Sequence, residues 1–274
     1  MALSGTRYRE HAPRPALRPR VRAIWELAGA CDDPAPQRMI PDGTMSLWFN
    51  FGAPLTSSSG DDVPTGGAVL LGELRRPFEI GSRGALDLVG VSFWTGRAGA
   101  FFDAPLRELV DRQVADPPLA TAHARAGVRA VAAAAPRDRI ALVQDALASA
   151  LAVPRRASPP VRQALALLGR DHEPPRVASL AETVGVSPRH LERGFADEVG
   201  IAPKSLASVL RFRRALAAIT TGGAELAAIA LDCGYVDQSH MVRDFTRFAG
   251  VPPTRFLAIE APRQRPEWLR RPVG

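Results

Sequence analysis

A short pattern of helix, glycine turn, capping residue and second helix occurs twice in the last third of the chain. The first copy is LAETVGVSPRHLERGF, residues 180–195, and the second is AAIALDCGYVDQSHMVRDF, residues 227–245. One such helix pair is often an ordinary corner between packed helices. Two copies with matching glycine, cap and Phe positions favour two helix-turn-helix units. The repeat therefore predicts an all-α region near the C-terminus.

Local signals define the helices of the first copy. Ser179 is expected to cap a helix that Gly185 ends, because glycine accepts the left-handed conformation at a helix C-terminus. Ser187 then caps the second helix, whose residues Leu191 and Phe195 are predicted to point inward. The outward residues of that second helix are Arg189, His190, Glu192 and Arg193.

The second copy repeats this arrangement. Glu225 opens its first helix, Gly234 makes the turn and Asp237 caps the next helix, whose inner stripe includes Phe245. Its outward residues are Gln238, Ser239, His240 and Arg243. In helix-turn-helix proteins the start of the second helix meets base edges in the major groove. Arg suits guanine there and Gln suits adenine, so the pattern predicts two base-reading helices.

The segment between the two copies, residues 203–220, is predicted to be one amphipathic helix. At about 18 residues it spans roughly 27 Å, a length compatible with two helices in major grooves that recur at about 34 Å. Its basic residues Lys204 and Arg211, with Arg213 and Arg214, suit phosphates, which position a protein without reading sequence.

Charge and composition fit a nucleic-acid partner without requiring one. The chain carries a net charge of +7, and the 119 residues from Arg156 onward hold 17 basic and 12 acidic residues. A basic domain favours a polyanion, although an Arg-rich composition alone explains the same excess. No secretory signal or run of about 18 apolar residues is present. We therefore expect a cytoplasmic protein without membrane contact.

The N-terminal half is predicted to be mostly β. Short apolar or alternating runs at residues 21–27, 45–51, 68–71 and 86–93 are separated by turn signals, which is typical of a small sandwich or open barrel. Helical segments are expected at residues 97–102 and 137–151, and the proline-rich segment 152–160 is expected to be a linker. The predicted fold class is α+β, with domains at residues 1–153 and 154–262 and a tail at 263–274. The two helix-turn-helix units fall at about 176–200 and 225–249.

The C-terminal residues resemble the AraC/XylS family of transcription regulators. The resemblance rests on SPRHLERGF at 187–195, IALDCGY at 229–235, DQSH at 237–240 and FTRFAGVPPTRF at 245–256. It covers about residues 158–260 and implies a seven-helix domain that binds double-stranded DNA. The family's two reading helices fall on Arg189, Glu192 and Arg193 and on Gln238, Ser239, His240 and Arg243. Tyr235 stands where the family usually has Phe, and Gly194 where it has a bulkier residue.

The N-terminal half is similar to a cupin-like domain of part of this family, on IPDGTMSLWFNFG at 40–52 and GVSFWTGRAGAFF at 90–102. The resemblance implies effector sensing, homodimer formation or both. RNA polymerase is a candidate partner, and the sequence leaves open whether the chain is an activator or a repressor. Trp25, Phe49, Phe51 and Phe93 are candidates for lining a small effector pocket. The alternative is that these rings fill the domain core, and strand alternation prevents all of them from sharing one face.

Two rival functions remain for the N-terminal half. One is an enzyme such as a DNA-repair alkyltransferase with Cys31 as its nucleophile, but no adjacent His or basic run lowers the pKa of that thiol. The other is a dimerisation arm without a ligand. Scattered histidines and two distant cysteines predict no metal site, and we expect no cofactor and no catalytic residues.

Overall fold

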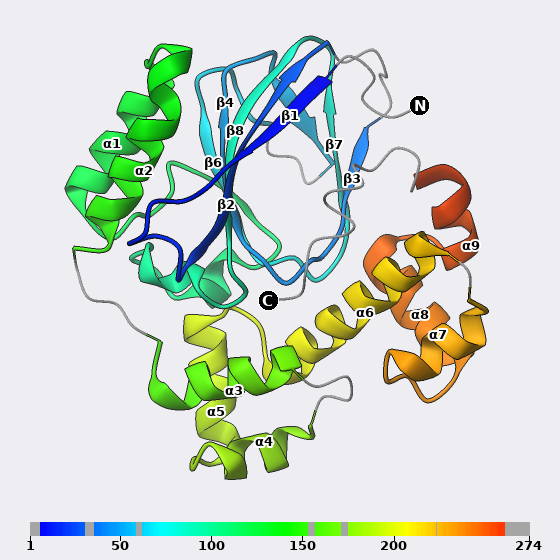
Figure 1. Ribbon diagram of the computed structural model, residues 1–274. Coiled ribbons are helices and arrows are strands. Elements are labelled where there is room, and N and C mark those ends of the chain that lie inside the picture. Colours follow the sequence, from blue (N-terminus) through cyan, green and yellow to red (C-terminus); the bar gives the residue numbers. More distant parts are fainter. Residues whose placement is uncertain are drawn as a thin grey trace.

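In the computed structural model, the structure describes residues 6–30, 36–58, 62–152, 157–170, 175–222 and 224–260. Cys31, much of the expected linker and the tail at 263–274 lie outside the described residues. A β-sheet domain is followed by a helical domain (Figure 1). No described helix is both long and apolar enough to cross a membrane.

The N-terminal domain contains two antiparallel sheets. The strands are β1 (Thr6–His11), β2 (Val21–Gly29), β3 (Gln37–Met39), β4 (Ser46–Asn50), β5 (Leu55–Ser57), β6 (Ala68–Leu71), β7 (Phe78–Ser82), β8 (Leu86–Phe93) and β9 (Gln113–Ala115). The larger sheet has the order β1-β2-β8-β4-β6-β9 and the smaller sheet has the order β3-β7-β5. Two short turns, η1 (Ala98–Ala100) and η2 (Leu106–Leu109), follow β8, and helices α1 (Ala122–Ala132) and α2 (Arg139–Ala150) flank the turn η3 (Pro136–Asp138).

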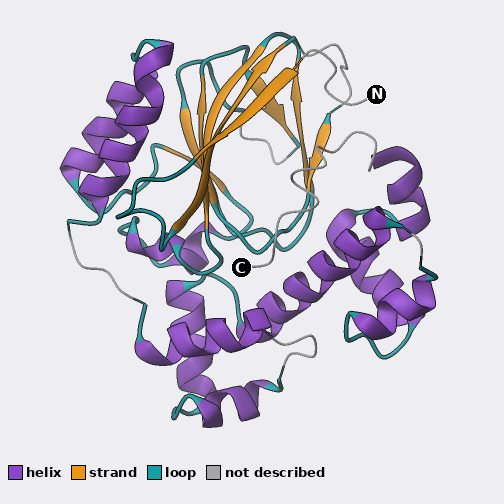
Figure 2. Cartoon of the chain, viewed as in Figure 1, coloured by secondary structure: helices purple, strands orange, loops and turns teal. Residues whose placement is uncertain are grey.

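These elements stack in three layers, with α1 and α2 on one face of the larger sheet and the smaller sheet on the other (Figure 2). Successive side chains along each strand point to opposite faces of the sheet, so one strand contributes residues to two separate cores. Leu47 and Phe49 of β4 pack towards the helices, whereas Trp48 between them packs towards the smaller sheet. The fold class predicted from the sequence, a β-sheet domain followed by a helical one, is confirmed.

The four aromatic residues that are candidates for lining an effector pocket are divided between these two cores. Phe49 and Phe93 are fully buried on the helix side, with Phe51 packed against the same cluster. Trp25 is buried on the opposite side of the sheet. Strand alternation thus keeps the four rings from sharing one face, as expected, and the helix-side rings pack into the domain core. A role of these residues in effector binding stays a prediction.

Trp25 is held by a close approach to the backbone of the adjacent strand. Its indole N–H donates to Ser92 Oγ at 3.1 Å, and its ring meets Trp48 edge-on with 5.8 Å between centroids. A Cβ added at Gly90 would lie 2.0 Å from Trp25 Cζ2. Only glycine therefore leaves room for the indole at this position of β8.

We expect Gly90→Ala to lower the free energy of unfolding by about 1–3 kcal/mol, because the added methyl overpacks a filled core. Thermal and urea denaturation followed by circular dichroism would measure the loss. Gly81→Ala in β7 is the matched control, since its nearest neighbour is the Thr56 hydroxyl at 3.1 Å, which can rotate away. Equal losses in the two variants would contradict the role of the Trp25 contact.

The C-terminal domain is built around one long helix. The helices are α3 (Pro159–Arg170), α4 (Val177–Thr183), α5 (Pro188–Glu198), α6 (Pro203–Thr221), α7 (Leu226–Asp232), α8 (Gln238–Ala249) and α9 (Pro253–Arg255), which continues into the π turn η4 (Phe256–Glu260). The first part of α6, with Leu206 and Leu210, joins a core with α3, α4 and α5. Its later part, with Phe212 and Leu216, joins a second core with α7 and α8. The two helix pairs thus lie towards opposite ends of α6 (Figure 1).

The two domains pack closely against each other. Near the end of α5, Arg107 of η2 forms an ion pair with Asp197. Near the end of α8, Arg38 of β3 donates from Nη1 to the carbonyl oxygen of Ala249 at 3.1 Å and from Nη2 to Glu79 at 2.8 Å. The β-sheet domain therefore contacts both helix pairs, in each case at the C-terminal end of the second helix.

A buried carboxyl group lies in this interface. Glu73 follows β6 and is almost inaccessible, and within the described part of the chain its Oε1 atom has no hydrogen-bond partner. Burial raises the pKa of Glu73, and nearby Asp42 raises it further, while Arg213 of α6 lowers it. Because the folded-state pKa is raised, the contribution of Glu73 to stability is fully present below the usual Glu pKa of about 4.3 and is lost as pH rises through the folded-state pKa.

We therefore expect Glu73→Gln to gain stability relative to the wild type as pH increases from about 4.5 to 8. Melting curves of both proteins across this range would show the difference. The result would contradict the raised pKa of Glu73 if the offset between the two proteins were independent of pH.

Candidate DNA-binding surface

The turn between α4 and α5 has the backbone geometry that the sequence predicts. Gly185 has a φ of +74°, and the N–H of Val186 donates to the carbonyl of Ala181 at 3.0 Å. Ser187 caps α5 by accepting the N–H of His190 at 3.2 Å. These bonds satisfy groups that a helix end otherwise leaves unpaired.

The turn between α7 and α8 repeats this geometry. Gly234 has a φ of +78°, and the N–H of Tyr235 donates to the carbonyl of Ala230 at 2.9 Å. Asp237 caps α8 by accepting the N–H of His240 at 2.6 Å. The second turn differs by one extra residue before the cap, Val236, which is 80% exposed.

Counting from the caps makes the two second helices equivalent. His190 and His240 both lie three residues after their caps. Leu191 matches Met241 and Phe195 matches Phe245, and all four side chains are fully buried. Arg193 and Arg243, six residues after their caps, are both exposed. Packing of the matched apolar residues therefore presents a cation at the same position of each helix.

The remaining predicted reading residues also lie on the open faces of α5 and α8. Arg189, His190 and Glu192 are exposed on α5, as are Gln238 and Ser239 on α8, whereas His240 is half-buried. The ring of His240 meets Tyr235 edge-on, with 5.1 Å between centroids. One residue thus differs from the expectation, since His240 is partly committed to packing inside its own unit.

One local feature of the first unit differs from the sequence-based expectation, and a second now has a physical reason. Helix α4 begins at Val177 with Arg176 as its N-cap residue, so Ser179 lies inside the first turn and is not the cap. The extended backbone that a cap requires is supplied by Arg176. Gly194 reflects packing, because a Cβ there would lie 2.8 Å from Val161 Cγ2 of α3.

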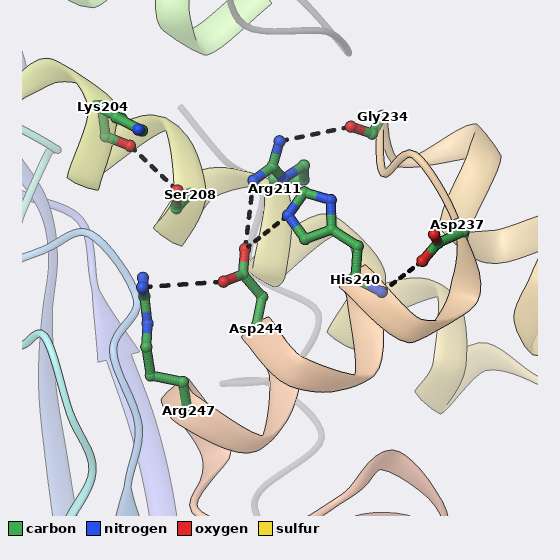
Figure 3. A network of polar contacts seen from close by, with 8 residues as sticks. All are labelled: Lys204, Ser208, Arg211, Gly234, Asp237, His240, Asp244 and Arg247. Carbon is green, nitrogen blue, oxygen red and sulfur yellow. Dashed lines mark hydrogen bonds and ion pairs between the residues drawn. The ribbon is translucent and has the colours of Figure 1, made fainter.

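An ion-pair network joins α8 to α6 (Figure 3). The carboxylate of Asp244 accepts from Arg211 Nη2 at 3.2 Å, with Arg247 Nη1 and His240 Nε2 each 3.9 Å away. Arg211 also donates from Nη1 to the carbonyl of Gly234 at 3.5 Å and lies over the ring of Tyr235. The side chains of Arg211 and Asp244 are only 15% and 14% exposed.

Arg211 is thus placed differently from the expectation that it contacts phosphate. It sits on the same stripe of α6 as Lys204, seven residues away, but its guanidinium is occupied by Asp244 and by the turn of the second unit. Lys204 is exposed at the other end of that stripe. Sequence reasoning missed the pairing because residues 211 and 244 lie far apart in the chain.

We expect Arg211→Ala to lower the free energy of unfolding by about 1–3 kcal/mol, because a mostly buried carboxylate loses its hydrogen-bonded partner. Lys204→Ala on the same stripe is the control and should change stability by no more than about 0.5 kcal/mol. Chemical denaturation would compare the two. Equal effects would show that Arg211 does not fix α8 against α6.

Comparison with known families supports this geometry. Residues 180–259 match a family model described as a helix-turn-helix domain. The HTH-type transcriptional regulator Rv1931c of Mycobacterium tuberculosis is 35% identical over 81 residues, which are 30% of this chain and 31% of the relative. The match thus spans about a third of that regulator's length.

Solved structures include similar domains. An AraC-type regulator from Chromobacterium violaceum is 28% identical, over 38% of this chain and 93% of that one, with a TM-score of 0.35. ToxT from Vibrio cholerae is 10% identical, over 82% of this chain and 97% of that one, with a TM-score of 0.48.

The C-terminal region is therefore a helix-turn-helix domain. More narrowly, residues 180–259 form a domain of the AraC type, as the resemblance in sequence implied. Residues 9–115 match a second model, described as a domain of unknown function (DUF6597).

Proposed function

We propose that this chain is a sequence-specific DNA-binding transcription regulator that places α5 and α8 in successive major grooves. The observation that carries the proposal is the matched pair Arg193 and Arg243, exposed at the same position after the two caps. Within the described residues, neither side chain has a hydrogen-bond or ion-pair partner. An unpaired arginine on each of two recognition helices is suited to bind the major-groove edge of a guanine.

The spacing of the two helices supports the same proposal. Helix α6 has 19 residues, about 28 Å at 1.5 Å per residue, against a groove repeat of about 34 Å. Its burial in both cores gives the two units a fixed separation. Lys204, exposed on α6, is proposed to contact phosphate and so to contribute affinity without sequence preference.

We propose that the chain divides into an N-terminal domain at residues 1–153 and a DNA-binding domain at residues 154–262. The N-terminal domain is proposed to have a regulatory role. Its contacts with the ends of α5 and α8 support a role in controlling DNA binding. The controlling event would be the binding of a small-molecule effector or of a second copy of the chain. RNA polymerase as a partner, the activator role and the cytoplasmic location stay predictions from sequence. The alkyltransferase reading rested on Cys31, which lies outside the described residues.

We expect Arg193→Ala and Arg243→Ala each to weaken binding to the cognate site by about 1–3 kcal/mol, with little effect on unrelated DNA. The site would first be obtained by selection from a random DNA library with the purified chain. Fluorescence anisotropy on selected and scrambled duplexes would then give both affinities at one salt concentration.

Two control variants sharpen this experiment. Lys204→Ala should weaken binding to both duplexes alike and reduce the salt slope by about 1. Arg129→Ala, an exposed cation on α1, should leave both affinities unchanged. Equal losses on both duplexes for Arg193→Ala and Arg243→Ala would refute their base-reading role, and failure to select any sequence would refute the function.

A further inference from the structure

A cleft of about 730 Å³ lies between the two domains. One wall comes from the β-sheet domain, through the loop before β2 and the segment that contains η1 and η2. The other wall comes from α3 and from the last turn of α5. Its volume falls within the usual range for small-molecule sites, roughly 300–1,000 Å³. None of the residues predicted to read DNA lines it.

Four arginines line this cleft. Arg107 is paired with Asp197, and the other three, Arg20, Arg97 and Arg162, come from three different segments and are called here the arginine cluster. Arg20 precedes β2, and its carbonyl accepts the N–H of Trp94 at 2.8 Å, which ties it to the loop that carries Arg97. A Cβ at Gly96 would lie 2.6 Å from Leu165 of α3. Leu165 is one turn after Arg162 on that helix, so the loop and Arg162 meet on the same face.

The acidic residues of the cleft do not neutralise the cluster. Asp197 is paired with Arg107, and Glu198 accepts the N–H of Ser158 at 2.7 Å and its hydroxyl at 3.3 Å. Asp103, also on the cleft wall, has an interaction of its own. Among the residues that the structure describes, no carboxylate forms an ion pair with a member of the cluster.

The like charges of the cluster act on one another. Burial lowers the pKa of Arg97, and the positive charges of Arg162 and Arg20 lower it further. Arg97 is half-buried, whereas Arg162 is exposed and donates from Nη1 to the carbonyl oxygen of Ala157 at 2.6 Å. A bound anion would offset the repulsion among these cations. Guanidinium groups also present a planar fork that binds phosphate and carboxylate through two parallel hydrogen bonds.

The cleft is not placed to contact the DNA that α5 reads. Glu198, on the cleft wall, is the last residue of α5. Arg189 lies at the other end of this 11-residue helix, which is about 16 Å long. Base edges meet the N-terminal end of a recognition helix, so the cluster lies at the end of α5 opposite to the residues proposed to read bases.

We propose that the arginine cluster binds a small organic anion carrying phosphate or carboxylate groups, held between the β-sheet domain and α3. Apolar residues of the same cleft, including Phe102 and Pro105, would contact the carbon part of the ligand. This inference assigns a chemical class and a binding site to the effector of the proposed function. A regulatory role for the bound anion rests on that proposed function. The binding itself is independent of DNA.

The test is direct titration of the full chain, without DNA, by isothermal titration calorimetry. The probes are inorganic phosphate and citrate, each against sodium chloride of matched ionic strength. We expect saturable binding of at least one probe, and which one binds separates phosphate from carboxylate ligands. Arg97→Gln and Arg162→Gln should each weaken it at least tenfold, because both domains supply cations, while Arg83→Gln, an exposed arginine outside the cleft, should not.

A stability measurement distinguishes a ligand site from a structural role. Without a probe, Arg97→Gln should melt no lower than the wild type, since the change relieves repulsion. With the probe, only the wild type and Arg83→Gln should gain several degrees. Should Arg97→Gln fail to fold, Arg20→Gln from the same wall replaces it in the titration and should weaken binding at least tenfold; unchanged binding in that variant would overturn the proposal.

Three outcomes would overturn the proposal: no saturable binding of either probe at 10 mM, equal binding in all variants, or a loss confined to one domain's arginines. The proposed DNA function is tested separately in a phosphate-free buffer. Failure of the anion site would leave sequence-specific DNA binding intact, whereas failure of DNA binding would leave the titration interpretable.

Discussion

The packing of α6 into two separate cores is the interaction on which the rest of the helical domain depends. Leu206 and Leu210 anchor the helix to the first unit, while Phe212 and Leu216 anchor it to the second. The side chains of Leu206 and Leu210 also lie beside Gly43 of the β-sheet domain, and Arg213 of the same helix is buried. A single rigid rod thus sets the distance between the recognition helices, and the Arg211–Asp244 pair adds a polar constraint on their orientation.

Sequence predicts the features of this chain whose causes are local. Gly185, Gly234, Ser187 and Asp237 act through backbone conformation and bonds to residues three positions away, so their roles follow from neighbouring letters. The strands at 68–71 and 86–93 are found where their apolar runs placed them. The DNA-reading roles of the exposed residues stay predictions, although the structure places most of them on the expected faces.

The features that sequence missed depend on residues far apart in the chain. Short strands such as β3 and β5 carry no strong alternation, and α1 lies in an Ala-rich segment whose burial depends on the sheet beneath it. Strand alternation predicted that the candidate aromatic rings could not all share one face, but it did not show which core each of Trp25 and Phe49 joins. The arginine cluster joins residues 20, 97 and 162, and no spacing rule connects such positions.

The extra residue in the second turn, Val236, has a consequence for symmetry. Both units share caps, glycines and buried residues, yet the second turn is one residue longer and its added residue is exposed. The two helix-turn-helix units therefore repeat one local arrangement without presenting identical surfaces. The two ends of α6 in a single chain are therefore different, so one chain alone would bind a DNA duplex in a defined orientation.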